Sequence, residues 1–221
     1  METKNESDCV PDLLSRFKTL LKVGVAMSAE KDGARLLEMI LTEAKKIAFA
    51  DAGTLYTYTN DNQLKFEIML NDTLAIRSGG TSGHSVVLPS LPLYDEKGKP
   101  NLDKVAACAA IRGETINIPD AYSDTEFEFS GTRAFDKKTG YHSKSFLTVP
   151  MKDHECEVIG VLQLINALDP VTGQLTVFTP SEQELVESLA SLAAVALVNQ
   201  QLLEKQSRLL DSLMMAPSYS I

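Results

Sequence analysis

The stretch FLTVPMKDHECEVIGVLQLIN, residues 146–166, contains the pattern that decides the fold. Its two ends, Phe146–Met151 and Glu157–Asn166, are rich in apolar and β-branched residues, and the polar residues Asp153–Cys156 lie between them. Two such runs joined by a short polar turn are typical of a β-hairpin. Because both runs are largely apolar, we expect this hairpin to lie at the centre of a sheet.

A second hairpin is predicted closer to the N-terminus. Residues Thr54–Thr59 and Leu64–Leu70 alternate with a period of two, and the polar residues Asn60–Asn62 separate them. Further along, LPLYDEKGKPN, residues 91–101, carries two prolines and a Lys-Gly-Lys turn, which predicts an exposed excursion rather than a domain linker.

Helical patterns flank these strands. Apolar residues recur at intervals of three and four in Val10–Leu21 and again from Asp32, a candidate N-cap, to Phe49. The alanine-rich segment Leu102–Ile111 predicts a short buried helix that ends at Gly113.

The last helix is expected to open at Thr179–Ser181, with Glu184 at capping-box spacing from Ser181. In NIPDAYSDTEF, residues 117–127, a short strand runs directly into Pro119, a residue that suits the first turn of a helix. We expect a helix there, whose N-terminal amides either face an anion or are capped by Asp120.

These elements together predict an α+β sandwich. Helices at both ends of the chain and a central antiparallel hairpin favour one mostly antiparallel sheet with the terminal helices packed on one face. Short helices and loops would cover the other face, where a pocket could form.

The C-terminal helix carries a heptad-like seam. Its residues are spaced alternately by four and three: Leu185, Leu189, Leu192, Ala196, Asn199, Leu203, Gln206, Leu210 and Leu213. The first half can pack on the sheet, whereas the second half has little surface of its own chain left to cover. Pairing with the N-terminal helix and a second subunit would bury the seam, and Asn199 would fix its register. The alternative is one long helix folded onto its own domain.

Composition limits the classes of partner. The 221 residues are 44% hydrophobic and carry a net charge of −9, which argues against unspecific binding to nucleic acid or anionic membrane. No apolar run approaches the roughly 20 residues that a bilayer span needs, and the charged opening METKNESDC lacks a signal peptide's apolar segment. We therefore expect a cytoplasmic protein.

No catalytic or metal-binding motif stands out. Cys9, Cys108 and Cys156 are widely spaced, and His84, His142 and His154 are scattered, which disfavours a disulfide framework and a metal site. A phosphate-binding or dinucleotide glycine motif is also missing from the sequence. The sequence predicts a protein that is not an enzyme and has no metal.

Four segments in order carry a family resemblance: NIPDAYSD (117–124), FDKKTGYHSKSFLTVPM (135–151), EVIGVLQLIN (157–166) and FTPSEQEL (178–185). The chain resembles GAF domains, particularly those of cyclic-nucleotide phosphodiesterases and bacterial signalling proteins, over roughly residues 20–203. The resemblance implies a dimerisation helix in residues 1–26, a GAF domain in 27–200 and a helical extension in 201–221.

The function that this resemblance implies is regulatory. A GAF domain of this kind senses a small molecule in a pocket under its cap, is usually dimeric, and passes the signal through its terminal helices to an output domain or partner protein. By the same resemblance, the ligand-binding positions are Leu70, Asn71, Val105, Ala106, Asp136, Thr139, Ser143 and Gln163.

The sequence departs from the family's cyclic-nucleotide members. Asn166 and Phe178 match the family's lock motif, but Ala167 stands where the motif has lysine, and Glu182 and Gln183 replace its acidic pair. The lysine salt bridge that closes the pocket therefore cannot form at those positions. A cyclic nucleotide is disfavoured as ligand, and the identity of the ligand stays open.

Positions near the phosphate-binding turn differ as well. Lys104 and Ala107 replace glycines; the Cβ of Ala107 could obstruct a close backbone approach, whereas Lys104 could offer a cation to a phosphate.

Other chemistries of the family remain as alternatives. A thiol-dependent reductase of free methionine sulfoxide would need clustered redox cysteines, and the three here are far apart in sequence. A bilin-attaching member would have histidine directly after its cysteine, where Ala109 follows Cys108, and the one candidate haem ligand is His142. A purely structural dimerisation module without ligand is the remaining alternative.

Overall fold

The computed structural model describes residues 9–214, and side chains from residue 18 to residue 211. Its centre is an 8-stranded sheet with strand order β3-β2-β1-β7-β6-β5, in which β4 also pairs with β2 and β8 with β7. These strand pairings are all antiparallel. The strands are β1 (Ala50–Tyr58), β2 (Gln63–Asn71), β3 (Ile76–Gly79), β4 (Leu91–Pro92), β5 (Ile116–Ile118), β6 (Phe146–Lys152), β7 (Val158–Leu168) and β8 (Leu175–Thr176).

Both predicted hairpins are confirmed. β1 and β2 pair across a turn that ends at Asn62, whose φ is 58°, and the Asp153 amide donates to the Glu157 carbonyl at 3.0 Å to close the turn between β6 and β7. β1 and β7 pair along the middle of the sheet, with Thr54 opposite Gln163. The hairpin of residues 146–166 thus supplies a central strand, as expected.

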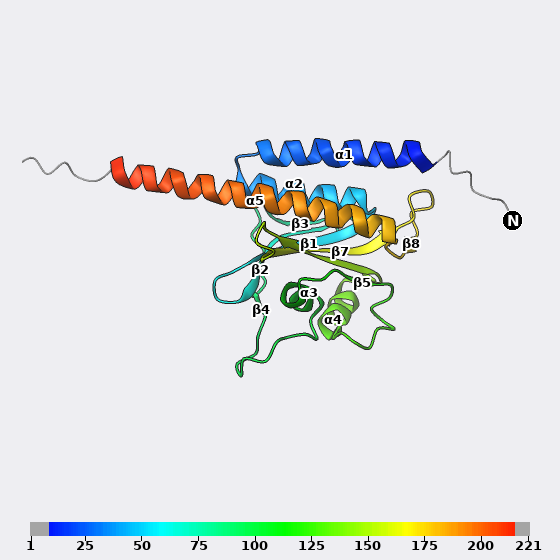
Figure 1. Ribbon diagram of the computed structural model, residues 1–221. Helices are drawn as coiled ribbons and strands as arrows, with labels where there is room; N and C mark the ends of the chain where they lie inside the picture. The colour runs from blue at the N-terminus through cyan, green and yellow to red at the C-terminus, as the bar shows by residue number, and fades with distance from the viewer. Residues whose placement is uncertain (1–8, 215–221) are drawn as a thin grey trace, which may run out of the picture.

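Helices cover both faces of the sheet (Figure 1). Helices α1 (Cys9–Ala29), α2 (Gly33–Ile47) and α5 (Pro180–Met214) lie on one face, and the shorter α3 (Val105–Arg112) and α4 (Ser130–Thr139) lie on the other. This is the predicted α+β arrangement. Asp32 caps α2 by accepting a hydrogen bond from the Arg35 amide at 3.0 Å, and Gly113 ends α3 with a φ of 63°.

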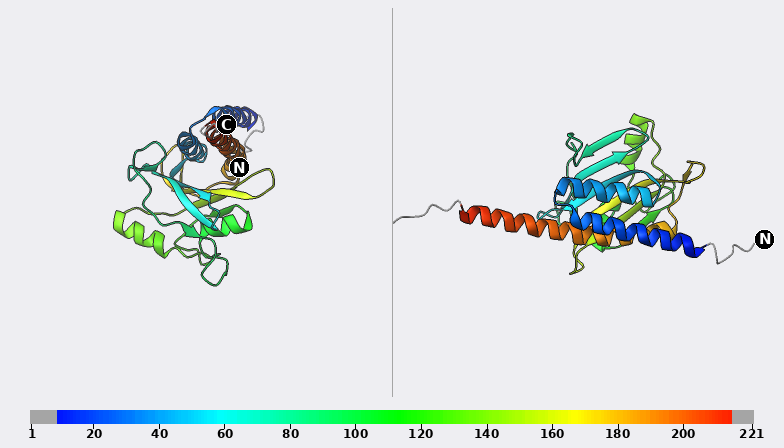
Figure 2. Two further views of the ribbon diagram at one scale, coloured as in Figure 1. Left: turned by 90° about the vertical axis from the view of Figure 1, so that its left-hand side faces the viewer. Right: turned by 90° about the horizontal axis from the view of Figure 1, so that it is seen from above.

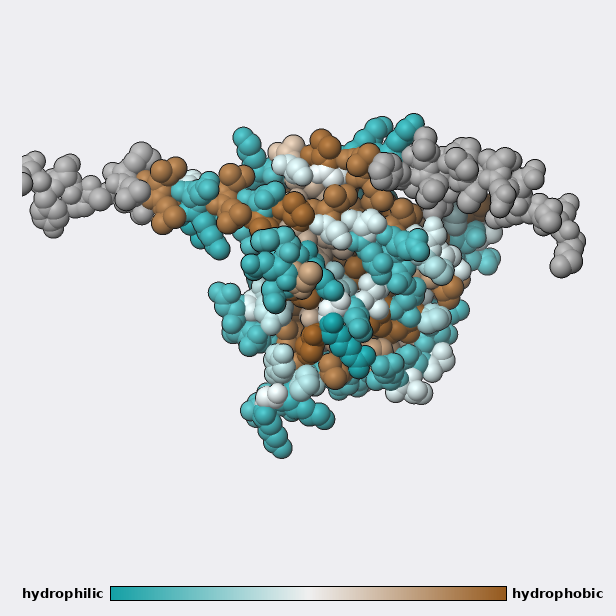
Figure 3. All heavy atoms as spheres, viewed as in Figure 1, coloured by the Kyte–Doolittle hydropathy of each residue, from teal (hydrophilic) through white to brown (hydrophobic). Residues whose placement is uncertain are grey.

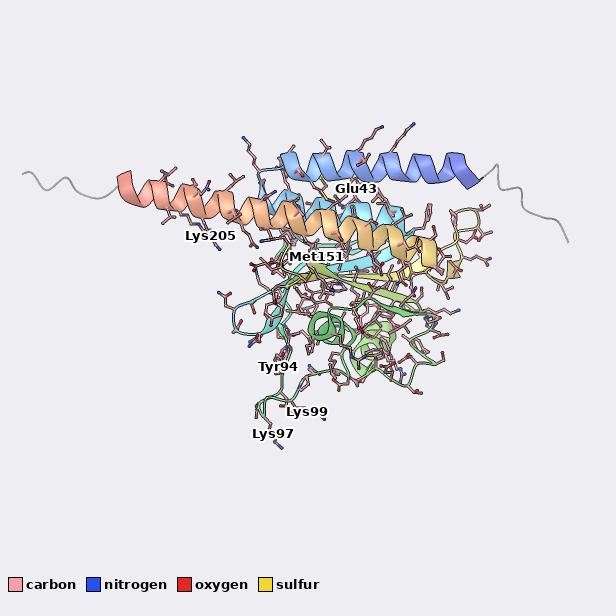
Figure 4. The ribbon with its side chains drawn as sticks, viewed as in Figure 1. Glu43, Tyr94, Lys97, Lys99, Met151 and Lys205 are labelled. Carbon is pink, nitrogen blue, oxygen red and sulfur yellow. The ribbon has the colours of Figure 1, made fainter. Side chains whose placement is uncertain are left out.

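The main core lies between the sheet and helices α2 and α5, and it extends to α1, which packs on those two helices. Figure 4 shows Met151 of β6 between the sheet and α5, and its side chain is fully buried. The residues that fill this layer are apolar side chains from both sides, including Leu36, Ile40, Leu55, Leu162, Leu164, Val186, Leu189 and Ala193. On the opposite side of the molecule, Figure 4 places Lys97 and Lys99 at the tip of the exposed excursion predicted for residues 91–101.

Helix α5 extends well beyond the sheet (Figure 2). Leu189 and Ala196 are buried against the domain, whereas Leu203 and Leu210 are 59% and 60% exposed. Lys205 lies on the projecting part in Figure 4, and Figure 3 shows apolar side chains along the same part with polar ones between them. The first half of the predicted seam therefore packs on its own domain and the second half, as far as its side chains are described, does not.

Helix α1 lies alongside α5 (Figure 2). Its Gly24 faces Leu192 so closely that a Cβ at this position would lie 3.1 Å from the leucine Cδ1. The side chains of the stripe predicted at residues 10–17, and that of Leu213, lie outside the described residues. So do the first eight residues of the predicted segment 1–26 and the last seven of 201–221.

Over Pro180–Asp211, α5 is long and apolar enough, by length and composition, to cross a membrane. From the sequence we expected no segment that could span a bilayer, because we considered only uninterrupted apolar runs. Such runs do not identify this helix. Within the most apolar window, 44% of the helix is buried in the structure. The buried part of this window packs on its own domain, and the core helix of a globular domain can have the same length and composition.

Two local predictions are wrong. No helix begins at Pro119: the Tyr122 amide donates to Asp120 Oδ1 at 2.9 Å and the Asp124 amide to the Asp120 carbonyl at 3.0 Å, so a turn follows the strand. The capping box of α5 is formed by Thr179 and Glu182, because the Thr179 amide donates to Glu182 Oε2 at 2.7 Å and the Glu182 amide to Thr179 Oγ1 at 3.3 Å.

Candidate ligand-binding cavity

A cavity of about 410 Å³ lies between the sheet and helix α4. The central strands β1 and β7 form its floor, β2 and β3 form one wall, and α4 with the segment that precedes β6 forms its roof. Its lining residues are Ala52, Gly53, Thr54, Tyr56, Phe66, Met69, Leu70, Asn71, Ile76, Leu88, Gly131, Thr132, Phe135, Tyr141, Ser143, Phe146, Gln163 and Ile165.

The floor holds a small polar network. The Tyr56 hydroxyl donates to Gln163 Oε1 at 3.3 Å, and Gln163 Nε2 donates to Thr148 Oγ1 at 3.1 Å. Burial raises the pKa of Tyr56 above its ordinary value, so its phenol stays protonated and neutral. These groups are held in place by one another, which leaves an ordered, uncharged polar floor.

Aromatic rings form much of the surrounding wall. The rings of Tyr56 and Phe66, on neighbouring strands, lie 4.6 Å apart between centroids. Phe146 packs against Phe129 with a centroid distance of 5.2 Å. Such tilted ring pairs fix each other's orientation, so the cavity presents flat apolar surfaces to its contents.

A buried carboxylate holds the roof together. Asp136 of α4 is 4% exposed and accepts hydrogen bonds from the Ser143 amide at 2.8 Å, the Ser143 hydroxyl at 2.8 Å and the Tyr122 hydroxyl at 2.7 Å. The bond that Tyr122 donates to Asp136 is the main reason why the pKa of Tyr122 is raised. Tyr122 also stacks against His142 at 4.5 Å between ring centroids. The helix is thereby tied to the segment that leads into β6.

A second buried carboxylate anchors the rim of the cavity. Asp51 accepts hydrogen bonds from the Tyr141 hydroxyl and, at 2.8 Å, from the Thr73 hydroxyl. Burial, followed by the bond to Asp51, raises the pKa of Tyr141. The Tyr141 side chain is therefore a fixed neutral wall of the cavity.

The structure brings together half of the residues predicted to bind ligand. Leu70, Asn71, Ser143 and Gln163 line the cavity. Asp136 lies behind the roof, where its carboxylate binds Ser143 and Tyr122 instead of facing the cavity.

The other three predicted residues lie elsewhere. Thr139 is exposed, and its hydroxyl donates to the Phe135 carbonyl at 2.9 Å within α4. Val105 is buried in an apolar cluster around Ile118 and Phe127, and Ala106 in one around Leu64 and Leu93. Because none of the three is among the lining residues, their predicted contact with a ligand is not supported by the geometry.

Residues at the lock-motif positions form hydrogen bonds that join segments of the fold. Asn166, at a φ of 61°, donates from its amide to the His142 carbonyl and accepts from the Lys144 amide, both at 2.7 Å. Gln183 accepts a hydrogen bond from the Asn117 side chain at 3.1 Å. A neutral amide pair thus joins β5 to the start of α5.

The two cysteines with described side chains do not line the cavity. Cys108 is buried in α3, and burial raises the pKa of its thiol. Cys156 is exposed in the turn between β6 and β7, in a different cleft that also contains Arg112 and Lys152. Within residues 18–211, no group of three or more His, Cys, Asp or Glu side chains is placed to hold a metal ion.

Several lining residues were not predicted from the sequence. Thr54 and Tyr56 alternate with buried Leu55 along β1, so the period of two already placed them on the face opposite the long helices. Phe135 and Thr132 lie in a helix that the sequence did not lead us to expect. Leu88, in the long connection between β3 and β4, had no pattern that could have placed it over the cavity.

The comparison with protein families agrees with this architecture. The family model described as GAF domain matches residues 32–197. The chain belongs to the GAF domain family. The match spans every strand and the buried first half of α5, so the family assignment covers the sheet and the cavity together.

The chain also resembles curated proteins over part of its length. It is 36% identical over 118 residues, or 53% of this chain, to "Dual 3',5'-cyclic-AMP and -GMP phosphodiesterase 11A" of Takifugu rubripes. It is 37% identical over 101 residues, or 46% of this chain, to "Dual 3',5'-cyclic-AMP and -GMP phosphodiesterase 11" of Drosophila melanogaster. The matches cover only 12% and 6% of those relatives.

Solved structures share the fold at low sequence identity. The GAF domain of the Coxiella burnetii phosphoenolpyruvate-protein phosphotransferase superposes with a TM-score of 0.62 at 16% identity, covering 87% of this chain and 98% of that one. The corresponding Acinetobacter domain gives 0.61 at 15% identity, with 86% and 98% covered. The free methionine-R-sulfoxide reductase of Neisseria meningitidis gives 0.57 at 13% identity, with 91% and 96% covered.

Proposed function

We propose that this GAF domain is a regulatory, non-catalytic sensor of a cytoplasmic signal-transduction protein. A small molecule binds in the cavity between the sheet and α4. The domain dimerises through helices in residues 1–26 and 201–221, which flank the sensing unit of residues 27–200. Through these helices, occupancy of the cavity is passed to an output domain or partner protein.

The cavity is the observation that carries the sensing role. Its volume of about 410 Å³ lies within the roughly 300–1,000 Å³ that is usual for small-molecule sites, and mostly apolar walls around a few convergent polar groups are typical of them. The floor around Gln163 is ordered by its own hydrogen bonds, so a ligand would meet a site that is already formed.

Dimerisation is supported by apolar side chains that a single chain leaves uncovered. Leu203 and Leu210 are exposed along the second half of α5, and Leu21 and Val25 are exposed on the neighbouring α1. An apolar helical seam of this kind is normally buried by another helix. Because α5 starts beside the sheet and continues past it (Figure 1), it connects the sensing unit to the dimer seam directly.

A cyclic nucleotide is a less favoured ligand. The curated relatives are named as phosphodiesterases of cyclic AMP and cyclic GMP, which makes these nucleotides the first compounds to test. In this chain, however, Ala167 is buried in the core where the lock motif would have lysine, and Gln183 is neutral. The salt bridge that would close the cavity cannot form there.

Two other functions are ranked lower. A thiol-dependent reductase needs a reactive thiol at the ligand, and neither Cys108 nor Cys156 lines the cavity. In a dimerisation module without ligand, protein side chains would be expected to fill the space under α4. In this structure that space is open.

The sensing role is tested by measuring thermal unfolding in the presence of cyclic nucleotides and a metabolite library. A ligand present at one hundred times its dissociation constant raises the free energy of unfolding by about 2.7 kcal/mol. Thr132→Trp, which places an indole on a lining position, should abolish the shift. Ala134→Trp, on the exposed side of the same helix, should not. A shift that survives Thr132→Trp, or no shift with any compound, would count against sensing in this cavity.

A further inference from the structure

The walls of the cavity carry no charged side chain. Among the lining residues, all of which lie within the described part of the chain, there is no Lys, Arg, His, Asp or Glu. Moving an ionised group out of water without a counter-charge or several hydrogen bonds is strongly unfavourable. The lining side chains therefore offer no counter-charge to an ionised ligand, which disfavours an anion in particular because the nearest carboxylates, Asp51 and Asp136, lie directly behind Tyr141 and Ser143.

The one helix end at the cavity does not change this conclusion. Gly131 and Thr132, in the first turn of α4, are lining residues, and a free helix N-terminus would attract an anion. Here, however, Glu128 accepts a hydrogen bond from the Ser130 amide, so a carboxylate already lies at this end. Lys104, which the sequence suggested as a cation for a phosphate, is bonded to the same carboxylate.

The floor still offers hydrogen bonds to a neutral ligand. The amide of Gln163 has two hydrogens and two acceptor lone pairs, and the floor network uses one hydrogen for Thr148 and one lone pair for Tyr56. One hydrogen and one lone pair of this amide therefore remain for a ligand. The rings of Phe66 and Phe146 flank this floor and suit a flat, apolar partner.

We infer that the cavity binds an uncharged, ring-bearing small molecule with an amide-like edge, and excludes ligands that carry a phosphate or carboxylate. The inference rests on the proposed sensing function and specifies its ligand class. The ring lies between the aromatic walls, while the polar edge pairs with the amide of Gln163.

Matched pairs of probes isolate the effect of charge. Indole-3-acetamide and indole-3-acetate, 2-naphthamide and 2-naphthoate, and quinoline-2-carboxamide and quinoline-2-carboxylate differ within each pair mainly in charge. Dissociation constants would be measured by protein-observed NMR on the full chain. We expect the better-binding amides to bind at least about tenfold more tightly than their carboxylates, a difference of about 1.4 kcal/mol.

Variants on α4 show where the probes bind and test whether charge causes the difference in affinity between amides and carboxylates. Thr132→Trp should abolish amide binding, and Ala134→Trp should leave it unchanged. A Cβ at Gly131 would meet no atom within 4 Å, so a side chain can start there. Gly131→Lys adds a cation at the cavity and should raise carboxylate affinity about tenfold by electrostatic attraction. Ala134→Lys adds the same charge on an exposed position outside the lining and should not. Melting curves confirm that each variant is folded.

The outcomes separate the two proposals. Carboxylates that bind in the cavity as tightly as the amides, or a cyclic nucleotide that binds there, would overturn the neutral-ligand inference and leave the sensing function standing. Amide binding that persists in Thr132→Trp would place the probes elsewhere and overturn the assignment. If neither the probes nor any compound of the metabolite library bind in the cavity, the sensing function fails as well.

Discussion

Asp136 and Ser143 are joined by two hydrogen bonds, each 2.8 Å long, from the serine amide and hydroxyl to the two oxygens of one buried carboxylate. This pair fixes helix α4 to the segment that enters β6, and so joins the two parts of the roof of the cavity. Both residues were predicted as ligand contacts, but in the structure they satisfy each other. Ser143 lines the cavity, whereas Asp136 keeps it in place.

Removing this carboxylate should weaken the roof. Asp136→Ala leaves the buried donors of Ser143 without an acceptor, which costs about 1–3 kcal/mol of the free energy of unfolding. Urea unfolding monitored by circular dichroism measures the change. Lys137→Ala, at the next and exposed position of the same helix, serves as control. Equal stability of the two variants would show that the roof does not depend on this carboxylate.

The pair of Glu128 and Lys104 predicts a pH dependence. Hydrogen bonds from Lys104 and then Ser130 lower the pKa of the Glu128 carboxyl from 4.5 to about 2. Because the folded-state pKa is depressed, the stabilisation is present above pH 4.5 and is lost as the pH falls towards 2. Since both side chains are 36% exposed, we expect no more than about 1 kcal/mol.

The measurement compares the melting of wild type and Glu128→Gln between pH 7 and about pH 2. The wild type should be the more stable at neutral pH, and the difference should shrink as the carboxyl becomes protonated. A difference that stays constant over this range would rule out the depressed pKa as its source.

A close backbone approach in the sheet predicts a large effect of one methyl group. A Cβ at Gly160 of β7 would lie 2.4 Å from the Tyr56 carbonyl oxygen, a contact that backbone movement alone can relieve. Gly160→Ala should therefore cost about 1–3 kcal/mol, as overpacking does. Gly131→Ala, with no atom within 4 Å, is the matched control and should be close to neutral. Similar unfolding midpoints for both variants would contradict this close approach of β1 and β7.

The projecting half of α5 predicts the behaviour of two further variants. Leu203→Glu places a charge in the proposed dimer seam and should convert a dimer to monomers. Gln201→Glu adds the same charge at an exposed position outside the seam and should leave the dimer intact. Sedimentation velocity gives the oligomeric state. A dimer unaffected by Leu203→Glu would place the interface elsewhere.

The periodicity of apolar residues predicted the main helices and strands of this fold well. The hairpins at residues 54–70 and 146–166 were visible because alternation and turn residues agreed within each segment, and Asp32 and Gly113 marked helix ends by their local chemistry. These features depend on neighbours in sequence, which is why a single sequence contains them.

The two wrong local predictions, the helix at Pro119 and the capping box at Ser181, arose where the same segment was compatible with two local patterns. Thr179 and Ser181 are both followed three residues later by glutamate, so spacing alone could not choose the capping pair. After Pro119, the Asp120 side chain bonds the backbone in a turn before any helix can start.

The residues that line the cavity were harder to predict than the helices and strands. Val105 and Ala106 lie in a helix that was predicted correctly, but whether this helix lines the cavity depends on tertiary packing, and none of its residues does. Leu88 reaches the cavity from a long connection without periodicity. Contacts of this kind are set by the assembled fold, and sequence spacing does not encode them.

Coupling between occupancy of the cavity and the α5 seam can be followed by methyl NMR of the full chain, titrated with a ligand that binds in the cavity. We expect the methyl resonances of Ile165, which lines the cavity, and of Leu203, on the projecting part of α5, to shift together and saturate at the same ligand concentration. Saturation of Ile165 with no change at Leu203 would show that the sensing unit and the seam are not coupled.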